Sequence, residues 1–85
     1  MSITEQRDMK YASCRTRAEQ AILSKYPQYK QLNIIRQGAG YAEKDLVSMN
    51  AFIDAVRARC DEYEAEIESA DDPGSIVIDY SDIQP

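Results

Sequence analysis

Apolar residues recur every three or four positions in the second half of the chain. The repeat is formed by Leu46, Met49, Ile53, Val56, Cys60, Tyr63, Ile67 and Ala70. Alternating spacings of three and four place such residues on one stripe of a helix, at the a and d positions of heptads. The pattern predicts an amphipathic helix over residues 45–70, capped by Asp45 or Ser48, with the stripe from Leu46 to Ile67 as its packing core.

A weaker stripe of the same kind lies near the N-terminus. Its members are Tyr11, Cys14, Ala18, Ala21 or Ile22, and Tyr26. Ser2 or Thr4 is a suitable N-cap for it, so the pattern predicts a first helix over residues 4–26. Because cysteine and alanine are small, we expect a neighbouring helix to approach this stripe closely.

Pro27 separates that helix from a short apolar and polar segment. Proline disfavours the α conformation at the residue before it, so it either starts a new helix or kinks a continuing one. We expect a second helix over residues 27–37 whose inner face is made by Tyr29, Leu32, and Ile35 or Arg36. The sequence Gly38-Ala39-Gly40 is expected to end it, because glycine tolerates the left-handed conformation that closes helices.

The C-terminal part of the chain changes pattern. Asp71-Asp72-Pro73-Gly74 predicts a turn, and residues 75–80 predict a strand or an extended arm with Ile76, Ile78 and Tyr80 on one face. A lone strand cannot satisfy its own backbone groups, so it must pack over the helices, pair with a second copy or extend a partner's sheet. The predicted fold is therefore all-α, a helical hairpin or three-helix unit over residues 1–72 with an extended arm over residues 73–85.

Composition and charge suggest that another chain contributes to the structure. Ile, Leu, Val and Phe together make up only 16 of the 85 residues, so the core is thin and self-association or a larger partner is expected. The net charge of −5 is unevenly distributed, with +4 on residues 1–42 and −9 on residues 43–85. Such halves attract each other within one molecule or between copies.

Several classes of function are excluded or weakened by what the sequence lacks. It contains no His, which removes the commonest general base and zinc ligand. It has no apolar run long enough to cross a membrane, no signal-peptide core and only two cysteines. We therefore expect a non-enzymatic cytosolic protein with no cofactor and no metal.

Two groups of residues have competing interpretations. Cys14 and Cys60 fall on opposite apolar stripes about one helical turn out of register, and they are either buried hydrophobic residues, a functional disulfide, or a nucleophile or metal pair. Seven of the twelve residues from 61 to 72 are acidic. This acidic tract is a solvated helix face, a docking surface for a basic partner or a mimic of nucleic-acid phosphates.

The predicted partner-binding residues combine aromatic, acidic and arm positions. They are Tyr26, Tyr29, Glu62, Glu66, Ile76, Ile78 and Tyr80. Tyrosine offers a large contact area at low entropy cost, which favours it at interfaces, although Tyr26 and Tyr29 are equally suited to filling a core at a helix junction.

Residues 21–33 (AILSKYPQYKQLN) resemble a segment common in small proteins of tailed bacteriophages associated with tail fibres or their assembly. The likeness extends over roughly residues 18–80, through an amphipathic helix like residues 49–59 to an acidic turn and an apolar tail like residues 72–80. The resemblance implies a structural or assembly protein that binds other phage tail proteins or copies of itself. The overall acidity argues against direct binding of nucleic acid, which requires a basic face, and no membrane partner is expected because the sequence has no apolar run of sufficient length. The resemblance also implies residence in the host cytoplasm during assembly, with the virion tail as an open alternative.

A second interpretation is a phage-encoded inhibitor of a host defence or nucleic-acid-binding protein. In that interpretation the acidic tract occupies a basic nucleic-acid groove of the host protein. Small size, acidity and a helical build suit such inhibitors.

Overall fold

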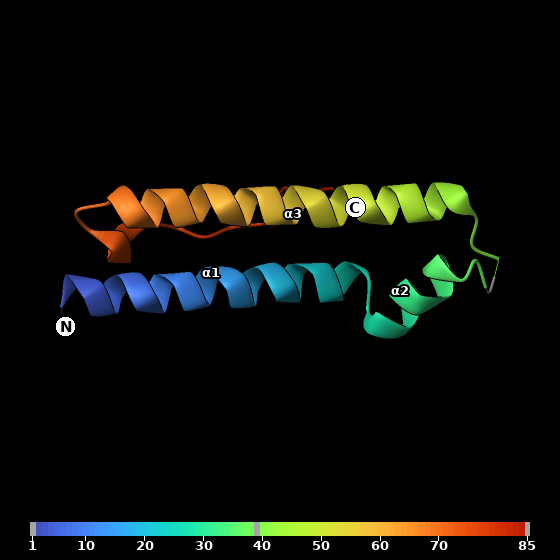
Figure 1. Ribbon diagram of the computed structural model, residues 1–85, viewed down its shortest axis with the longest axis horizontal. Coiled ribbons are helices and arrows are strands. Elements are labelled where there is room, and N and C mark those ends of the chain that lie inside the picture. The colour runs from blue at the N-terminus through green and yellow to red at the C-terminus, as the bar shows by residue number, and fades with distance from the viewer. Residues whose placement is uncertain (1, 39, 85) are drawn as a thin grey trace.

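The protein is all-α (Figure 1), as expected, in a computed structural model that describes residues 2–38 and 40–84. Its elements are α1 (Ile3–Lys25), α2 (Gln28–Ile35), α3 (Glu43–Ser69) and the 3₁₀ turn η1 (Pro73–Ser75). The predicted order of a long helix, a short helix, a long helix and an arm is confirmed. Ala39, which belongs to the Gly38-Ala39-Gly40 sequence expected to end the second helix, lies outside the described residues.

α1 and α3 form an antiparallel hairpin that makes up most of a rod measuring 51 × 17 × 16 Å (Figure 1). The seam between them buries Cys14 and Ala18 of α1, whose small side chains allow the expected close approach of the two helices. The α1 N-terminus is capped by Ser2, whose hydroxyl accepts a hydrogen bond from the Glu5 amide.

The predicted stripe of α3 faces this seam. Met49, Val56, Cys60 and Ile67 are buried, whereas Leu46, Ile53 and Tyr63 are half-buried and pack against them. Phe52 is buried beside the stripe and completes it. The helix begins two residues earlier than predicted, and the Asp45 carboxylate accepts the Ala42 amide at 2.8 Å.

Pro27 breaks the helix rather than kinking it. Tyr26 has φ −130° and ψ 79°, outside the helical region, and α2 starts only at Gln28. The prediction of the α2 inner face is wrong, because Ile34 is the buried residue of α2 while Tyr29, Leu32 and Ile35 are exposed. Because the break at Pro27 separates α2 from α1, the orientation of α2 follows from its own packing, which places Ile34 in the core cluster.

α2 ends in a Schellman motif one residue before the glycines. The Gly38 amide donates to the Asn33 carbonyl and the Gln37 amide donates to the Ile34 carbonyl. The left-handed residue of this motif is Gln37, with φ 53°, and not Gly38 as expected. Gly40, with φ 83°, takes the second left-handed position before α3.

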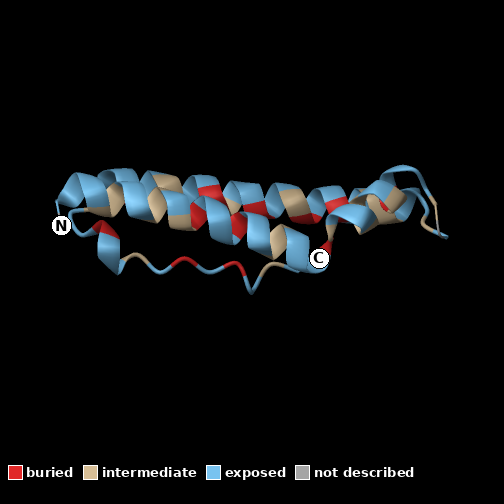
Figure 2. Ribbon diagram, turned by 90° about the horizontal axis from the view of Figure 1, so that it is seen from below, coloured by how far each residue is buried: buried red, intermediate tan, exposed pale blue. Residues whose placement is uncertain are grey.

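The C-terminal residues after η1 run as an extended arm along the α1–α3 seam (Figure 2). Over residues 76–84 the arm contains no strand, so the strand alternative is wrong and packing over the helices is the outcome. Its backbone carbonyls are satisfied by side chains of the two long helices. Lys10 donates to the Ile76 carbonyl at 2.7 Å, Arg17 to the Ile78 carbonyl at 3.2 Å, and Tyr63 and Arg59 to the Asp79 carbonyl at 2.9 and 3.1 Å.

Candidate functional site

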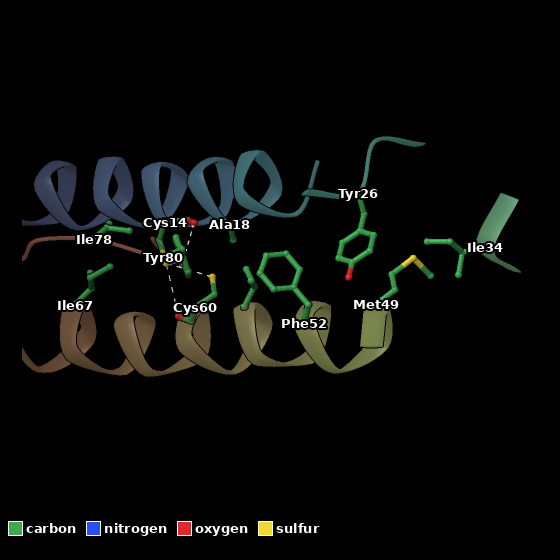
Figure 3. Close-up of a cluster of buried hydrophobic side chains, with 11 residues drawn as sticks. Cys14, Ala18, Tyr26, Ile34, Met49, Phe52, Cys60, Ile67, Ile78 and Tyr80 are labelled. Atoms are coloured by element: carbon green, nitrogen blue, oxygen red, sulfur yellow. Dashed lines mark hydrogen bonds between the residues drawn. The ribbon is translucent and has the colours of Figure 1, made fainter. Parts of the chain in front are cut away.

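The arm residues predicted to bind a partner instead complete the core of this chain. Ile78 and Tyr80 are buried against the helices (Figure 3). Ile76 packs against the same cluster. The prediction of a partner role is therefore wrong for Ile78 and Tyr80, because their alternating side chains cover the seam that α1 and α3 leave open. The thin core inferred from the composition is completed by the molecule's own C-terminus.

Tyr26 is likewise a core residue at the junction of α1 and α2. Its ring packs 5.6 Å from the Phe52 ring at an interplanar angle of 49° (Figure 3). The Lys30 ammonium lies 5.2 Å from the centre of the Tyr26 ring. The Gln31 amide donates to the Tyr26 carbonyl at 2.7 Å, which ties the start of α2 to this junction. The partner role predicted for Tyr26 is wrong, and the alternative of core filling is correct.

Tyr29 is the member of the predicted aromatic pair that faces outward. Tyr29, Leu32 and Ile35 are 71%, 47% and 57% exposed, and their spacing of three places them along one side of α2. We call these three residues the α2 face. The segment that contains it, residues 20–42, includes Lys25, Lys30 and Arg36 and no acidic residue.

The acidic tract occupies the opposite end of the rod. Glu62 and Glu66, the two predicted partner-binding acids, are exposed on α3. Acidic residues at a helix C-terminus oppose the helix dipole, and Arg7 of α1 offsets this by donating to the carbonyls of Ile67 at 3.2 Å and Ala70 at 2.9 Å. Glu64 is the half-buried member of the tract, and it forms an ion pair with Arg15 at 2.8 Å.

The two cysteines meet at the centre of the seam, and both are free thiols (Figure 3). Their Sγ atoms are 3.2 Å apart, and the Cys14 Sγ lies 3.1 Å from the Tyr80 hydroxyl. Burial raises the pKa of Cys14 to about 11, and burial together with the hydrogen bond to Cys14 raises the pKa of Tyr80. Both groups are therefore neutral at physiological pH. The contact joins α1, α3 and the arm in one cluster.

One groove borders this cluster on the side of the seam away from the arm. It has a volume of about 560 Å³, and its lining includes Ile22 of α1 and Cys60 of α3. Its charged lining is mixed, with Arg15 and Arg57 opposed by Glu19 and Asp61. Cys60 is therefore the thiol of the pair that a small solute reaches first.

Within residues 2–38 and 40–84, no three His, Cys, Asp or Glu side chains lie together in a way that would hold a metal ion. None of the helices in that part of the chain has the length and apolar character needed to cross a membrane. No family model matches the chain, and no curated protein or solved structure matches it.

Three residues important to these surfaces escaped the sequence reasoning. Leu32 and Ile35 were expected inside, and the signal that could have placed them is Pro27, which fixes a new register for α2. The role of Arg7 was missed because its partners are backbone carbonyls of α3, which leave no trace in the side-chain pattern.

Proposed function

We propose that this chain is a non-enzymatic bacteriophage protein that binds another tail or tail-fibre protein during assembly, and that the α2 face is its docking surface. The main support for this docking surface is that Tyr29, Leu32 and Ile35 are exposed on a helix only eight residues long. A short helix keeps little of its stability in isolation, and exposing three of its large apolar side chains suits a contact with another protein. The proposal is also supported by position, because Tyr29 and Leu32 belong to the segment that resembles phage tail proteins.

The charges around the α2 face indicate the chemistry of its occupant. The surrounding residues 20–42 carry three basic side chains and no acid, so the face complements an apolar surface rimmed by carboxylates. A second protein of this kind is the proposed occupant. The chain would meet it in the host cytoplasm during assembly and accompany it into the virion tail.

Site-specific photo-crosslinking tests this proposal directly. A photoreactive residue at position 32 is expected to crosslink to a phage tail protein in infected cells. The matched control is position 77 in the arm, which is more exposed than position 32 (78% against 47%) but lies away from α2. Equal crosslinking from both positions, or none to a tail protein from position 32, would contradict the proposal. Crosslinks between two copies would assign the face to self-association instead.

Charge substitution on the same face supplies an independent test. Leu32→Glu and Ile35→Glu place carboxylates on an exposed surface, so the helical circular dichroism spectrum is expected to stay unchanged while partner binding falls at least tenfold. Val47→Glu introduces the same charge at another exposed apolar position and is expected to bind normally.

A second candidate function rests on the exposed acidic tract. Glu62 and Glu66 project from α3 without the ion pair that engages Glu64, as expected of a surface that competes with nucleic acid for a basic groove. An inhibitor of this kind would be made early in infection and would not enter particles. Glu62→Gln with Glu66→Gln should then weaken competition with nucleic acid, whereas Leu32→Glu should not.

A further inference from the structure

The cysteine pair and the groove beside it point to a chemical modification that is independent of the proposed function. We propose that Cys60 and Cys14 are an oxidisable dithiol: Cys60 reacts with a small zwitterionic disulfide, such as glutathione disulfide, entering from the groove, and Cys14 then closes an internal disulfide. Two observations carry the proposal, namely the direct contact of the two sulfurs and the unequal access to them.

The contact between the sulfurs is close enough for a bond to form with little movement. The Sγ atoms are 3.2 Å apart and a disulfide bond is about 2.0 Å long, so they must approach by about 1.2 Å. Both side chains are at the seam of two packed helices, which hold them opposite each other. Rotation of the two side chains is expected to close the gap while α1 and α3 stay packed.

Access to the two thiols differs because only one of them reaches the groove. Cys14 is 0% exposed, whereas Cys60 is 9% exposed and lines the groove. The groove volume of about 560 Å³ is within the range of small-molecule sites. Its lining carries charges of both signs, Arg15 and Arg57 with Glu19 and Asp61, which suits a tripeptide that carries both ammonium and carboxylate groups. Cys60 is thus the attacking thiol and Cys14 the resolving one.

The reaction proceeds by two thiol–disulfide exchanges. In the first, Cys60 loses its proton and its sulfur attacks glutathione disulfide, forming a mixed disulfide and releasing one glutathione thiolate, which takes up a proton. In the second, Cys14 loses its proton and its sulfur attacks the Cys60 sulfur, which expels the second glutathione. Two protein thiols are oxidised to one disulfide while one glutathione disulfide is reduced to two thiols. Burial raises the pKa of Cys14 to about 11, which lowers the fraction of attacking thiolate in the second exchange.

The internal disulfide would fasten α1 to α3 at the middle of the rod. The Tyr80 hydroxyl donates to the backbone carbonyl of Cys14 at 3.1 Å, and oxidation of the sulfur leaves that hydrogen bond in place. The arm is therefore expected to stay seated in the oxidised protein. The oxidised protein retains its fold and gains resistance to unfolding.

The test is to incubate the folded, reduced full-length chain with glutathione disulfide and follow it by intact mass and thiol titration. The wild type is expected to lose two hydrogens and both free thiols, and its melting temperature should rise. Cys14→Ser should accumulate one stable glutathione adduct on Cys60, because the resolving thiol is absent. Cys60→Ser should stay unmodified while folded.

Three results would overturn the proposal. They are a wild type that keeps both thiols free, a wild type that forms crosslinked dimers in place of the internal disulfide, and a Cys60→Ser variant that gains an adduct as fast as the wild type. Circular dichroism first confirms that each variant is folded. Cys14→Ala and Cys60→Ala replace any serine variant that is not, since alanine introduces no buried hydroxyl.

Discussion

The hydroxyl of Tyr80 donates a hydrogen bond to the backbone carbonyl of Cys14 at 3.1 Å, which joins the end of the arm to the middle of α1. The same hydroxyl lies beside the Cys14 sulfur, and the Tyr80 ring meets the Tyr63 ring of α3 edge-on at 5.7 Å. A single arm residue therefore contacts both long helices. The arm is a structural third layer of the hairpin and not a free binding segment, so substitutions in it should act on stability.

Neighbouring residues of the arm provide a direct test of this role. Ile78 is 5% exposed and Val77 is 78% exposed, because successive side chains of an extended segment point to opposite sides. Ile78→Ala is expected to lower the free energy of unfolding by about 2–4 kcal/mol through loss of buried contacts and an unfilled cavity. Val77→Ala should change it by less than about 0.5 kcal/mol. Urea denaturation of both variants measures the difference, and equal effects would mean that the arm does not form part of the core.

The free energy of unfolding should fall at alkaline pH because the Cys14 thiol is buried at the seam between α1 and α3. The Cys14 thiol has a pKa of about 11 in the folded chain against 9.0 when unperturbed. Above pH 9 the unfolded chain therefore loses this proton while the folded chain keeps it, so stability present below pH 9 is lost as the pH rises toward 11. The raised pKa of Tyr80 acts in the same direction at higher pH.

The measurement is the urea midpoint of the reduced protein across this pH range, in wild type and in Cys14→Ala. Other groups also titrate at alkaline pH, so the informative quantity is the difference between the two curves. The wild-type midpoint should fall more steeply than that of Cys14→Ala. Parallel curves would show that the Cys14 thiol titrates alike in the folded and unfolded chains.

The long helices could be predicted from the sequence because their apolar stripes are local and periodic. The stripe from Leu46 to Ile67 repeats over several heptads, and each repeat fixes the same face of α3. Which side of α2 faces the core could not be predicted in this way, because a helix of eight residues contains only about two turns. Its orientation is set by tertiary contacts of Ile34 and by the break at Pro27.

The surface on which the arm packs could not be predicted from the sequence either. The alternation of Ile76, Ile78 and Tyr80 correctly indicates an extended segment with one apolar face, but it does not say what that face covers. The answer depends on Lys10, Arg17 and Arg59, which satisfy the arm's carbonyls from two other elements. Such side-chain to backbone pairs are distant in sequence and have no periodic signature. The candidate site was affected in the same way: Tyr29 was placed on the inner face of the second helix and is exposed, whereas Tyr80 was assigned to a partner and is buried.

Arg7 is expected to stabilise the C-terminus of α3. The last turn of α3 has no basic residue of its own, and Arg7 donates to two of its final carbonyls. Arg7→Met keeps much of the apolar stem but removes both hydrogen bonds and the charge, so unfolding should become easier by about 1–2 kcal/mol. Arg57→Met, at an exposed position of α3, is the matched control and should change stability by less than about 0.5 kcal/mol.

Salt dependence separates the two contributions of Arg7. The interaction of its charge with the helix dipole is screened by salt, whereas the hydrogen bonds persist. The destabilisation by Arg7→Met should therefore shrink in concentrated salt without vanishing. If Arg7→Met lowered the free energy of unfolding no more than Arg57→Met does in urea denaturation, the hydrogen bonds from Arg7 to the Ile67 and Ala70 carbonyls would not stabilise the protein.

Gln37 offers a substitution that should stabilise the protein. Its φ of 53° lies in the left-handed region, where a side chain is strained and glycine is not. Gln37→Gly keeps the Schellman hydrogen bonds, which use only the backbone, and should raise the free energy of unfolding by about 0.5–1 kcal/mol. Gln20→Gly is the matched control, because glycine inside α1 should cost about 1 kcal/mol. Opposite signs in urea denaturation are the expected result, and destabilisation by both would show that Gln37 is not strained.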